Sequence, residues 1–215
     1  MRQYICLFLI LLSQYLYAPN YDKFTRNHQN ALTEQESKIS EQAYQKESKI
    51  DEKDVLFIHK YHMEKYFGIN ERRKLRTICE ELEIKPEWLY KVIFIESCGD
   101  IYKPNPYSGA IGAIQFLPST ARLLGTDTSK IKKMSMCQQL DLTKLYIQKA
   151  SNGHKIHSAI QLYLLVFFPN AAYQKDDYII GGYKTNVYKY NKALCQKDSV
   201  LKVGHIRNLI NRIFI

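Results

Sequence analysis

One acidic side chain closes an apolar run in the stretch VIFIESCGDIYKPNPYSGAIGAIQFLPSTARLLG, residues 92–125. That acid is Glu96, and a turn rich in Pro, Asn, Ser and Gly follows it. A second apolar segment then carries one amide, Gln115. Val92 and Ile93 precede the acid by four and three residues, so they share its face of a helix. The sequence therefore predicts a glutamate at the C-terminal end of a buried stripe.

A carboxyl group in this position suits acid–base catalysis. Apolar surroundings and the negative end of the helix dipole both disfavour the ionised form, so we expect a raised pKa for Glu96. A glutamic acid that stays protonated near neutral pH can act as a general acid. The alternative is that Glu96 bends out to water, as most glutamates in a last helical turn do. Asp100 is the rival as a second carboxylate, but it follows Gly99 in a turn where Asp is common.

The residues around this acid include several that could contact a ligand. Small residues would let a ligand ring approach the main chain. A buried amide is costly unless it is paired, which favours a ligand-facing role for Gln115. For Ser97 a bond to its own helix is the more ordinary use, and for the apolar members core packing is the alternative. The candidate binding residues here are Ser97, Ser108, Gly112, Ala113, Gln115 and Leu117.

The elements that position these residues are mainly helices. Helical patterns cover residues 54–68, 71–82, 87–97, 118–125, 137–151, 155–168 and 199–214. Residues 108–116 are the best candidate for extended structure, which predicts a small β-hairpin or extended segment near the candidate active site at Glu96. Residues 186–206 predict no more than a connection into the terminal helix.

The N-terminus has the layout of a secretory signal over residues 1–18. Arg2 precedes a short apolar core that is too short to span a bilayer, and a small residue stands at the expected cut. We expect export, with an uncleaved anchor as the alternative. Residues 19–54, rich in Glu, Lys, Gln and Ser, predict a polar tether or solvated helix, with a short coiled coil as the alternative. The globular domain is expected over 55–215, with its motif core at 86–125.

Composition narrows the classes of partner. The 46% apolar content excludes a wholly disordered chain. The net charge of +10 falls to +9 without Arg2 and suits a polyanion: nucleic acid, acidic lipid or an anionic wall polymer. Seventeen tyrosines against one tryptophan are typical of surfaces that stack on sugars or bases. The charges are scattered singly and export disfavours nucleic acid, so we expect none as a partner.

Cysteine and histidine spacing argues against a metal site. The cysteines beyond the signal are Cys79, Cys98, Cys137 and Cys195. They could form two disulfides in an oxidising compartment, with three connectivities, or remain buried thiols. None has the spacing of a zinc site. The pairs His59 with His62 and His154 with His157 lack a third ligand, so we expect no metal.

A family resemblance follows from the motif as a whole. Glu96-Ser97, then ten residues, then SGAIGAIQFLPSTA resembles the catalytic domain of soluble lytic transglycosylases. That family shows Glu-Ser at a helix end, an Asn-Pro element, and Ser-Gly-Ala-x-Gly-x-x-Gln-x-x-Pro-x-Thr-Ala. The positions that match are Asn105, Pro106, Ser108, Gly109, Ala110, Gly112, Gln115, Pro118, Thr120 and Ala121. The resemblance covers residues 86–125, extends to about 173, and is absent from the tail.

The resemblance implies a mainly α, lysozyme-like fold and cleavage of the β-1,4 bond between N-acetylmuramic acid and N-acetylglucosamine in peptidoglycan. Glu96 would protonate the leaving oxygen while the substrate's acetamido oxygen attacks the sugar carbon. It would then take the proton of the C6 hydroxyl as a 1,6-anhydro ring closes. No metal or cofactor is required. The family's later Ala-Tyr-Asn-Ala-Gly element is missing, which leaves Tyr163 and Tyr173 as candidates for its tyrosine.

The expected partner is the peptidoglycan glycan strand, met by an exported monomer in the periplasm, in the cell envelope or outside the cell. A role beside secretion, conjugation or phage machinery would fit. The alternatives are a lysozyme-type hydrolase of the same fold and a non-catalytic peptidoglycan-binding protein. A basic nucleic-acid binder would require the signal prediction to be wrong.

Overall fold

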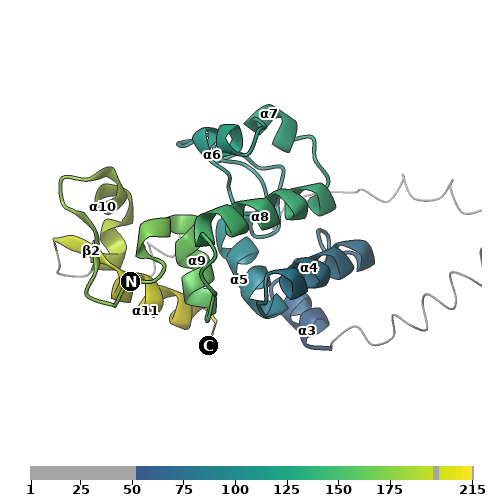
Figure 1. Ribbon diagram of the computed structural model, residues 1–215, viewed down its shortest axis with the longest axis horizontal. Coiled ribbons are helices and arrows are strands. Elements are labelled where there is room, and N and C mark those ends of the chain that lie inside the picture. The colour runs from purple at the N-terminus through teal and green to yellow at the C-terminus, as the bar shows by residue number, and fades with distance from the viewer. Residues whose placement is uncertain (1–51, 196–198, 215) are drawn as a thin grey trace, which may run out of the picture. The chain divides into compact units, whose positions relative to one another are not determined.

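A computed structural model describes residues 52–195 and 199–214 (Figure 1). The chain divides into two units, Met1–Ile50 and Asp51–Ile215, and the described residues belong to the second. The expected signal and nearly all of the expected tether lie outside them. Among the described residues, the first helix begins at Glu52. Asp54 is already buried, and its carboxylate lies 2.9 Å from Nε of Arg76. The folded unit therefore starts slightly ahead of the boundary expected at residue 55.

The described residues are mainly helical, as predicted, and they include a small two-stranded antiparallel sheet. In chain order the elements are α3 (Glu52–Lys60), α4 (Ile69–Glu81), α5 (Pro86–Ser97), α6 (Pro118–Leu123), α7 (Thr128–Ile131), α8 (Met136–Ser151), α9 (Ala159–Phe167), η2 (Pro169–Ala171), β1 (Ile179–Gly182), α10 (Asn186–Asn191), η3 (Lys192–Cys195), β2 (Val200–Lys202) and α11 (Val203–Ile213).

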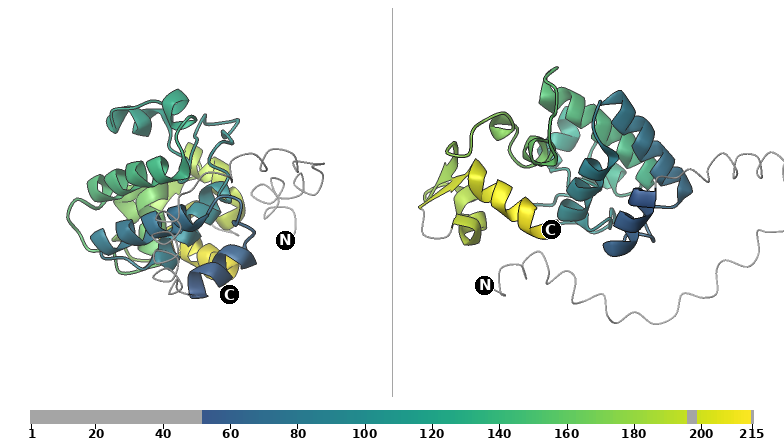
Figure 2. Two further views of the ribbon diagram at one scale, coloured as in Figure 1. Left: turned by 90° about the vertical axis from the view of Figure 1, so that its right-hand side faces the viewer. Right: turned by 90° about the horizontal axis from the view of Figure 1, so that it is seen from below.

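Helix α5 is the centre of the core. It lies between α4 and α9, and α3 also packs against it (Figure 1). Leu89, Val92 and Ile93 on this helix are no more than 1% exposed. Helix α8 packs against both α4 and α9. The short helices α6 and α7 project on the side of α8 opposite α11 (Figures 1 and 2). The predicted helices over 87–97 and 137–151 are thus the two that organise the unit.

Helices α3 and α4 are each followed by a residue other than glycine in the left-handed conformation, and both end before the boundary that the sequence predicts. The helix predicted over 54–68 ends at Lys60, where His62 adopts a φ of 54° and Met63 N donates to Ile58 O at 2.9 Å. Helix α4 ends in the same way, with Glu83 at a φ of 54°. This left-handed ending normally selects glycine, so His and Glu in that position give no signal in the sequence.

The sheet lies in the tail and not in the segment expected to be extended. Residues 108–116 form turns that one bridge closes, between Ile111 and Phe116. The strands are β1 and β2, and α10 packs against both. The stretch 186–206, expected to be a connection, therefore holds α10, η3 and β2, and the helix expected over 199–214 begins at Val203. Helix α11 also packs against α9, so the tail is part of the unit's core.

The four cysteines of the described residues are thiols, and the alternative of buried thiols holds for two of them. Cys79 and Cys195 are buried, and Cys98 and Cys137 are partly exposed. Burial raises the pKa of the Cys79 thiol far above its ordinary value, which keeps it protonated. Within residues 52–195 and 199–214, no helix has the length and apolar character needed to cross a membrane.

The contact between β1 and α10 predicts an effect of adding one methyl group. A Cβ at Gly181 would collide with Cγ1 of Val187 and lie 2.5 Å from Oγ1 of Thr185. Gly181→Ala should therefore lower the free energy of unfolding by about 1–3 kcal/mol, measured by denaturant titration. Gly182→Ala is the matched control, because a Cβ there meets nothing within 4 Å. Equal stability of the two variants would contradict the packing of α10 on β1.

Candidate active site

Glu96 stands at the end of α5, one residue before the last. Val92 and Ile93 on its face are buried, as the sequence predicts, while Glu96 itself is partly exposed. Burial raises the pKa of Glu96 to about 8, well above the ordinary value for a glutamate. Glu96 therefore lies at the helix end and favours its protonated form near neutral pH. These are the properties expected of a general acid.

The chain leaves α5 directly after this glutamate. Cys98 and Gly99 both adopt positive φ, 52° and 81°, and turn the backbone away from the helix. Gly99 has a second constraint, since a Cβ there would lie 2.8 Å from the Tyr66 ring. Asp100 follows in this turn, where its carboxylate accepts a hydrogen bond from Tyr102 N. Asp100, the alternative carboxylate to Glu96, therefore has the turn-forming role that the sequence favoured.

Ser97 connects the end of α5 to the segment 108–116. Its Oγ lies 3.1 Å from Ile93 O, the bond within the helix that the sequence favoured. It also lies 2.9 Å from Ala113 O. The two halves of the sequence motif, sixteen residues apart, therefore meet at this hydroxyl.

Ser108 belongs to a turn that is held by its own side chains. Asn105 Oδ1 accepts hydrogen bonds from the backbone N–H groups of Tyr107 and Ser108 at 3.0 and 3.1 Å. Ser108 Oγ accepts from Ala110 N at 3.3 Å. The exposed Ser108 hydroxyl thus accepts a hydrogen bond within the turn. Its O–H donor is not used by that bond.

The segment from Ile111 to Phe116 is a tight loop closed by two backbone hydrogen bonds, 2.8 and 3.1 Å long. Gly112 and Gln115 adopt positive φ, 95° and 52°. Gln115 donates to Gly112 O through both its backbone N–H, at 3.0 Å, and its Nε2, at 3.2 Å. Its amide nitrogen therefore stabilises the loop, and its carbonyl oxygen is the part left for a ligand.

Gln139 holds this loop in place, and sequence reasoning missed it. Its side chain is wholly buried. Oε1 accepts from Ala113 N at 2.8 Å, and Nε2 donates to Ile131 O at 3.0 Å and to Met134 O at 3.4 Å. A Cβ on Gly112 would lie 2.7 Å from that Oε1, so the glycine is required for the approach. The available signal was a glutamine on the apolar side of the helix predicted over 137–151.

Two tyrosines lie within electrostatic reach of Glu96. Burial, and then the charge of Glu96, raises the pKa of Tyr146 to about 12 and that of Tyr163 well above its ordinary value. Tyr163 was a predicted candidate, and it is buried on α9 with its ring stacked on Phe167. Tyr146 on α8 was missed. Its hydroxyl donates to Leu165 O at 2.8 Å and its ring lies edge-on to Phe116, so it joins α8, α9 and the loop.

The remaining predicted residues divide between core and surface. Ala113 is wholly buried, so it packs in the core, whereas Leu117 is 45% exposed. Tyr173 donates to His154 O at 3.3 Å and its ring lies against that of His154. Burial alone raises the pKa of Tyr173. Of the two candidate tyrosines, Tyr163 is therefore the one whose electrostatics involve Glu96.

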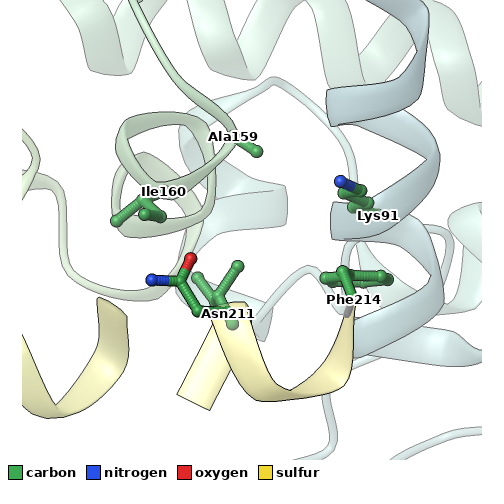
Figure 3. Close-up of a pocket in the computed structure, with 6 residues that line it drawn as sticks. Lys91, Ala159, Ile160, Asn211 and Phe214 are labelled. Atoms are coloured by element: carbon green, nitrogen blue, oxygen red, sulfur yellow. The ribbon is translucent and has the colours of Figure 1, made fainter. Parts of the chain in front are cut away.

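A pocket opens elsewhere, between α5, α9 and α11 (Figure 3). Its lining residues are Lys91, Ala159, Ile160, Ile210, Asn211 and Phe214. Lys91 precedes Glu96 by five residues, which places it about 140° away around the helix. The pocket therefore lies on a different side of α5 from the acid. Across residues 52–195 and 199–214, no three His, Cys, Asp or Glu side chains are grouped to hold a metal ion.

Comparison with known proteins adds no relative. No protein-family model matches the chain, and none of the curated proteins is significantly similar to it.

The buried amide of Gln139 predicts a large loss of stability when it is removed. Gln139→Leu leaves Ala113 N–H and Ile131 C=O without their side-chain partner in the interior. We expect the free energy of unfolding to fall by about 2–3 kcal/mol. Gln148→Leu, on the exposed face of the same helix, is the matched control and should change stability by less than about 0.5 kcal/mol. Similar urea midpoints for the two variants would refute the role of Gln139.

The raised pKa of Glu96 predicts a pH-dependent cost to folding. Between about pH 4.3, the ordinary glutamate value, and about pH 8, the folded chain holds a proton that the unfolded chain has released. Stability must therefore fall as pH rises through this window, and it stays lowered above it. Glu96→Gln removes this effect, so it should gain stability over the wild type at pH 8.5 more than at pH 5, measured by urea unfolding.

Glu87→Gln, which changes an exposed carboxylate on the same helix, is the control for this comparison. Parallel stability curves for the wild type and Glu96→Gln across the window would mean that the Glu96 carboxyl is not buried enough to hold its proton.

Proposed function

We propose that this protein is a peptidoglycan lytic transglycosylase of lysozyme-like fold, with Glu96 as its acid and base. The observation that carries the proposal is the state of that one carboxyl group. The residue is partly exposed at the end of α5, burial raises the pKa of its carboxyl group to about 8, and Ser97 beside it is bonded to the Gly-Ala-Ile-Gly-Ala-Ile-Gln loop.

The first step would be proton donation. Glu96 protonates the glycosidic oxygen as the bond to the anomeric carbon of N-acetylmuramic acid breaks. The acetamido oxygen of the same sugar attacks that carbon from the other face, so the substrate supplies the nucleophile. A protein nucleophile is then unnecessary. Asp100, the nearest acid in the sequence, is engaged in its turn, and the raised pKa of Glu96 is caused by burial and not by a neighbouring carboxylate. Most glycosidases, by contrast, use a carboxylate pair.

The second step would return the proton. The Glu96 carboxylate takes the proton of the C6 hydroxyl, whose oxygen attacks the anomeric carbon and displaces the acetamido oxygen. The product is a 1,6-anhydro sugar, no water is consumed, and Glu96 is protonated again. A carboxylate with a pKa near 8 is a stronger base than an ordinary one, so the same burial assists both steps.

The surrounding residues would orient the acid and the sugar. Tyr146 and Tyr163 bring two hydroxyl groups within electrostatic reach of Glu96. One of them would serve where the family motif has its tyrosine. Gln115 Oε1, Ser108 and the exposed Leu117 would line the sugar side. Export to the periplasm or cell envelope as a monomer belongs to the same proposal, since the glycan substrate lies there.

Mass spectrometry of digested peptidoglycan tests the proposal. Purified peptidoglycan is incubated with the chain, with Glu96→Gln and with Glu87→Gln, and the released fragments are weighed. We expect 1,6-anhydro-muropeptides from the wild type and from Glu87→Gln. The Glu96→Gln variant should release at least about 1,000-fold less, because it has lost the general acid and base.

Other products would identify the alternatives. Fragments with reducing ends, lost in Glu96→Gln, would keep the site but make the protein a lysozyme-type hydrolase. Binding to peptidoglycan without any cleavage would make it a binding protein and Glu96 a residue without a catalytic role.

A further inference from the structure

The tail forms a surface that the proposed reaction does not use. Thr185 begins α10, donating to Gly182 O at 2.7 Å and accepting from Tyr188 N. Tyr188 is buried, and Asn191 Nδ2 donates to Val187 O at 2.8 Å. The bond from Thr185 to Gly182, the close approach of Gly181 to Val187 and the packing of α10 against both strands hold this helix on the sheet. The outward residues of this part are therefore presented in a defined arrangement.

Two of the outward residues are tyrosines with unusually high exposure. Tyr183 is 60% exposed and Tyr190 is 81% exposed. A folded chain normally scatters its exposed large side chains singly. Here both rings fall within the stretch 183–192, one just before α10 and one near its end, so both are displayed by this part of the chain.

The same stretch carries positive charge without neutralising acids. Lys184, Lys189 and Lys192 are all exposed, and residues 178–195 contain no Asp or Glu. Just before this stretch, Asp176 is paired with Arg207 at 2.7 Å. Lys184 Nζ lies over the Tyr183 ring, 5.6 Å from its centre, so a ring and a charge are in contact here. A ligand that fits must offer a flat apolar ring face and a negative charge at similar spacing.

We propose that Tyr183, Lys184, Lys189, Tyr190 and Lys192 form a second binding surface for peptidoglycan. The rings stack on the faces of the pyranose sugars, and the lysines pair with the carboxylates of the lactyl groups and stem peptides. The inference rests on the proposed function, which supplies a polymer with both features. Its role is to retain the chain on an insoluble substrate between cleavage events at Glu96.

Co-sedimentation with purified, insoluble peptidoglycan tests this surface. The full-length chain carries Glu96→Gln so that the polymer stays intact. One variant adds Tyr183→Ser and Tyr190→Ser, and a second adds Lys184→Gln, Lys189→Gln and Lys192→Gln. Each should weaken binding at least about five-fold, a loss of about 1 kcal/mol. The binding of the parent should also weaken as salt is raised.

A control variant of the same net charge distinguishes binding by this surface from an effect of net charge alone. Lys60→Gln, Lys133→Gln and Lys149→Gln together remove the same charge from exposed positions on other elements. Binding by this control should stay within about two-fold of the parent, since scattered exposed charges contribute little. Equal losses in the control and the lysine variant would overturn the surface and leave a non-specific charge effect. Unchanged thermal unfolding midpoints verify that all variants are folded.

Cleavage assays distinguish failure of this inference from failure of the proposed function. With Glu96 restored, the tail variants should cleave short soluble glycan fragments at the wild-type rate. Full binding by the tail variants, with anhydro products still formed, would overturn the surface alone. Tail-dependent binding without any cleavage would overturn the transglycosylase and keep the surface. A loss of binding to a DNA oligonucleotide that exceeds the loss on peptidoglycan would overturn the choice of partner.

Discussion

The buried amide of Gln139 is the interaction on which the arrangement around Glu96 depends. Gln139 lies near the start of α8. Its side chain joins the loop, at Ala113, to the backbone of Ile131 and Met134. The loop contains two left-handed residues and is closed by a single bridge, and the Gln139 amide adds hydrogen bonds that join it to residues outside it. Ser97 then joins the carbonyl of the same residue, Ala113, to the end of α5, beside the acid.

Burying Glu96 lowers the free energy of unfolding, and the apolar residues of α5 offset that loss. A partly buried carboxyl at the negative end of a helix is unfavourable in its charged form. The same helix buries Leu89, Tyr90, Val92, Ile93 and Ile95, whose removal from water stabilises the fold far more than one carboxyl destabilises it. The acid also sits at the helix end, where the chain can turn away at Cys98 and Gly99 and leave one side open. Folding can therefore tolerate at this position a group whose properties are useful for chemistry.

The sequence predicted those parts of the molecule that local pattern controls. The apolar period of α5 placed Glu96 on the buried stripe, and the Gly and Pro residues marked the ends of α5 and α6. Contacts between distant residues had no such pattern. The helical pattern does not distinguish Gln139 from other glutamines, because its partners Ala113 and Ile131 are distant in the sequence. It also does not distinguish Tyr146 from a tyrosine that only packs in the core. The strands of the tail contain three or four residues each, and β1 ends in two glycines, so no alternating pattern could develop. The endings at His62 and Glu83 were hidden because tertiary packing imposed a conformation that glycine normally adopts.

The proposed chemistry requires one group to be acid and base in turn, and the pKa of about 8 suits both steps. At pH 7 such a group is protonated in about nine molecules of ten, whereas an ordinary glutamate with a pKa near 4.3 is protonated in about one of 500. The protonated fraction decides how often the first step can begin. Once the proton has gone, the same shift makes the carboxylate a better acceptor for the C6 hydroxyl proton. A pair of carboxylates with separated pKa values divides these tasks between two residues. Burying one glutamate at the end of an apolar helix gives both properties to a single residue, provided that the substrate brings its own nucleophile.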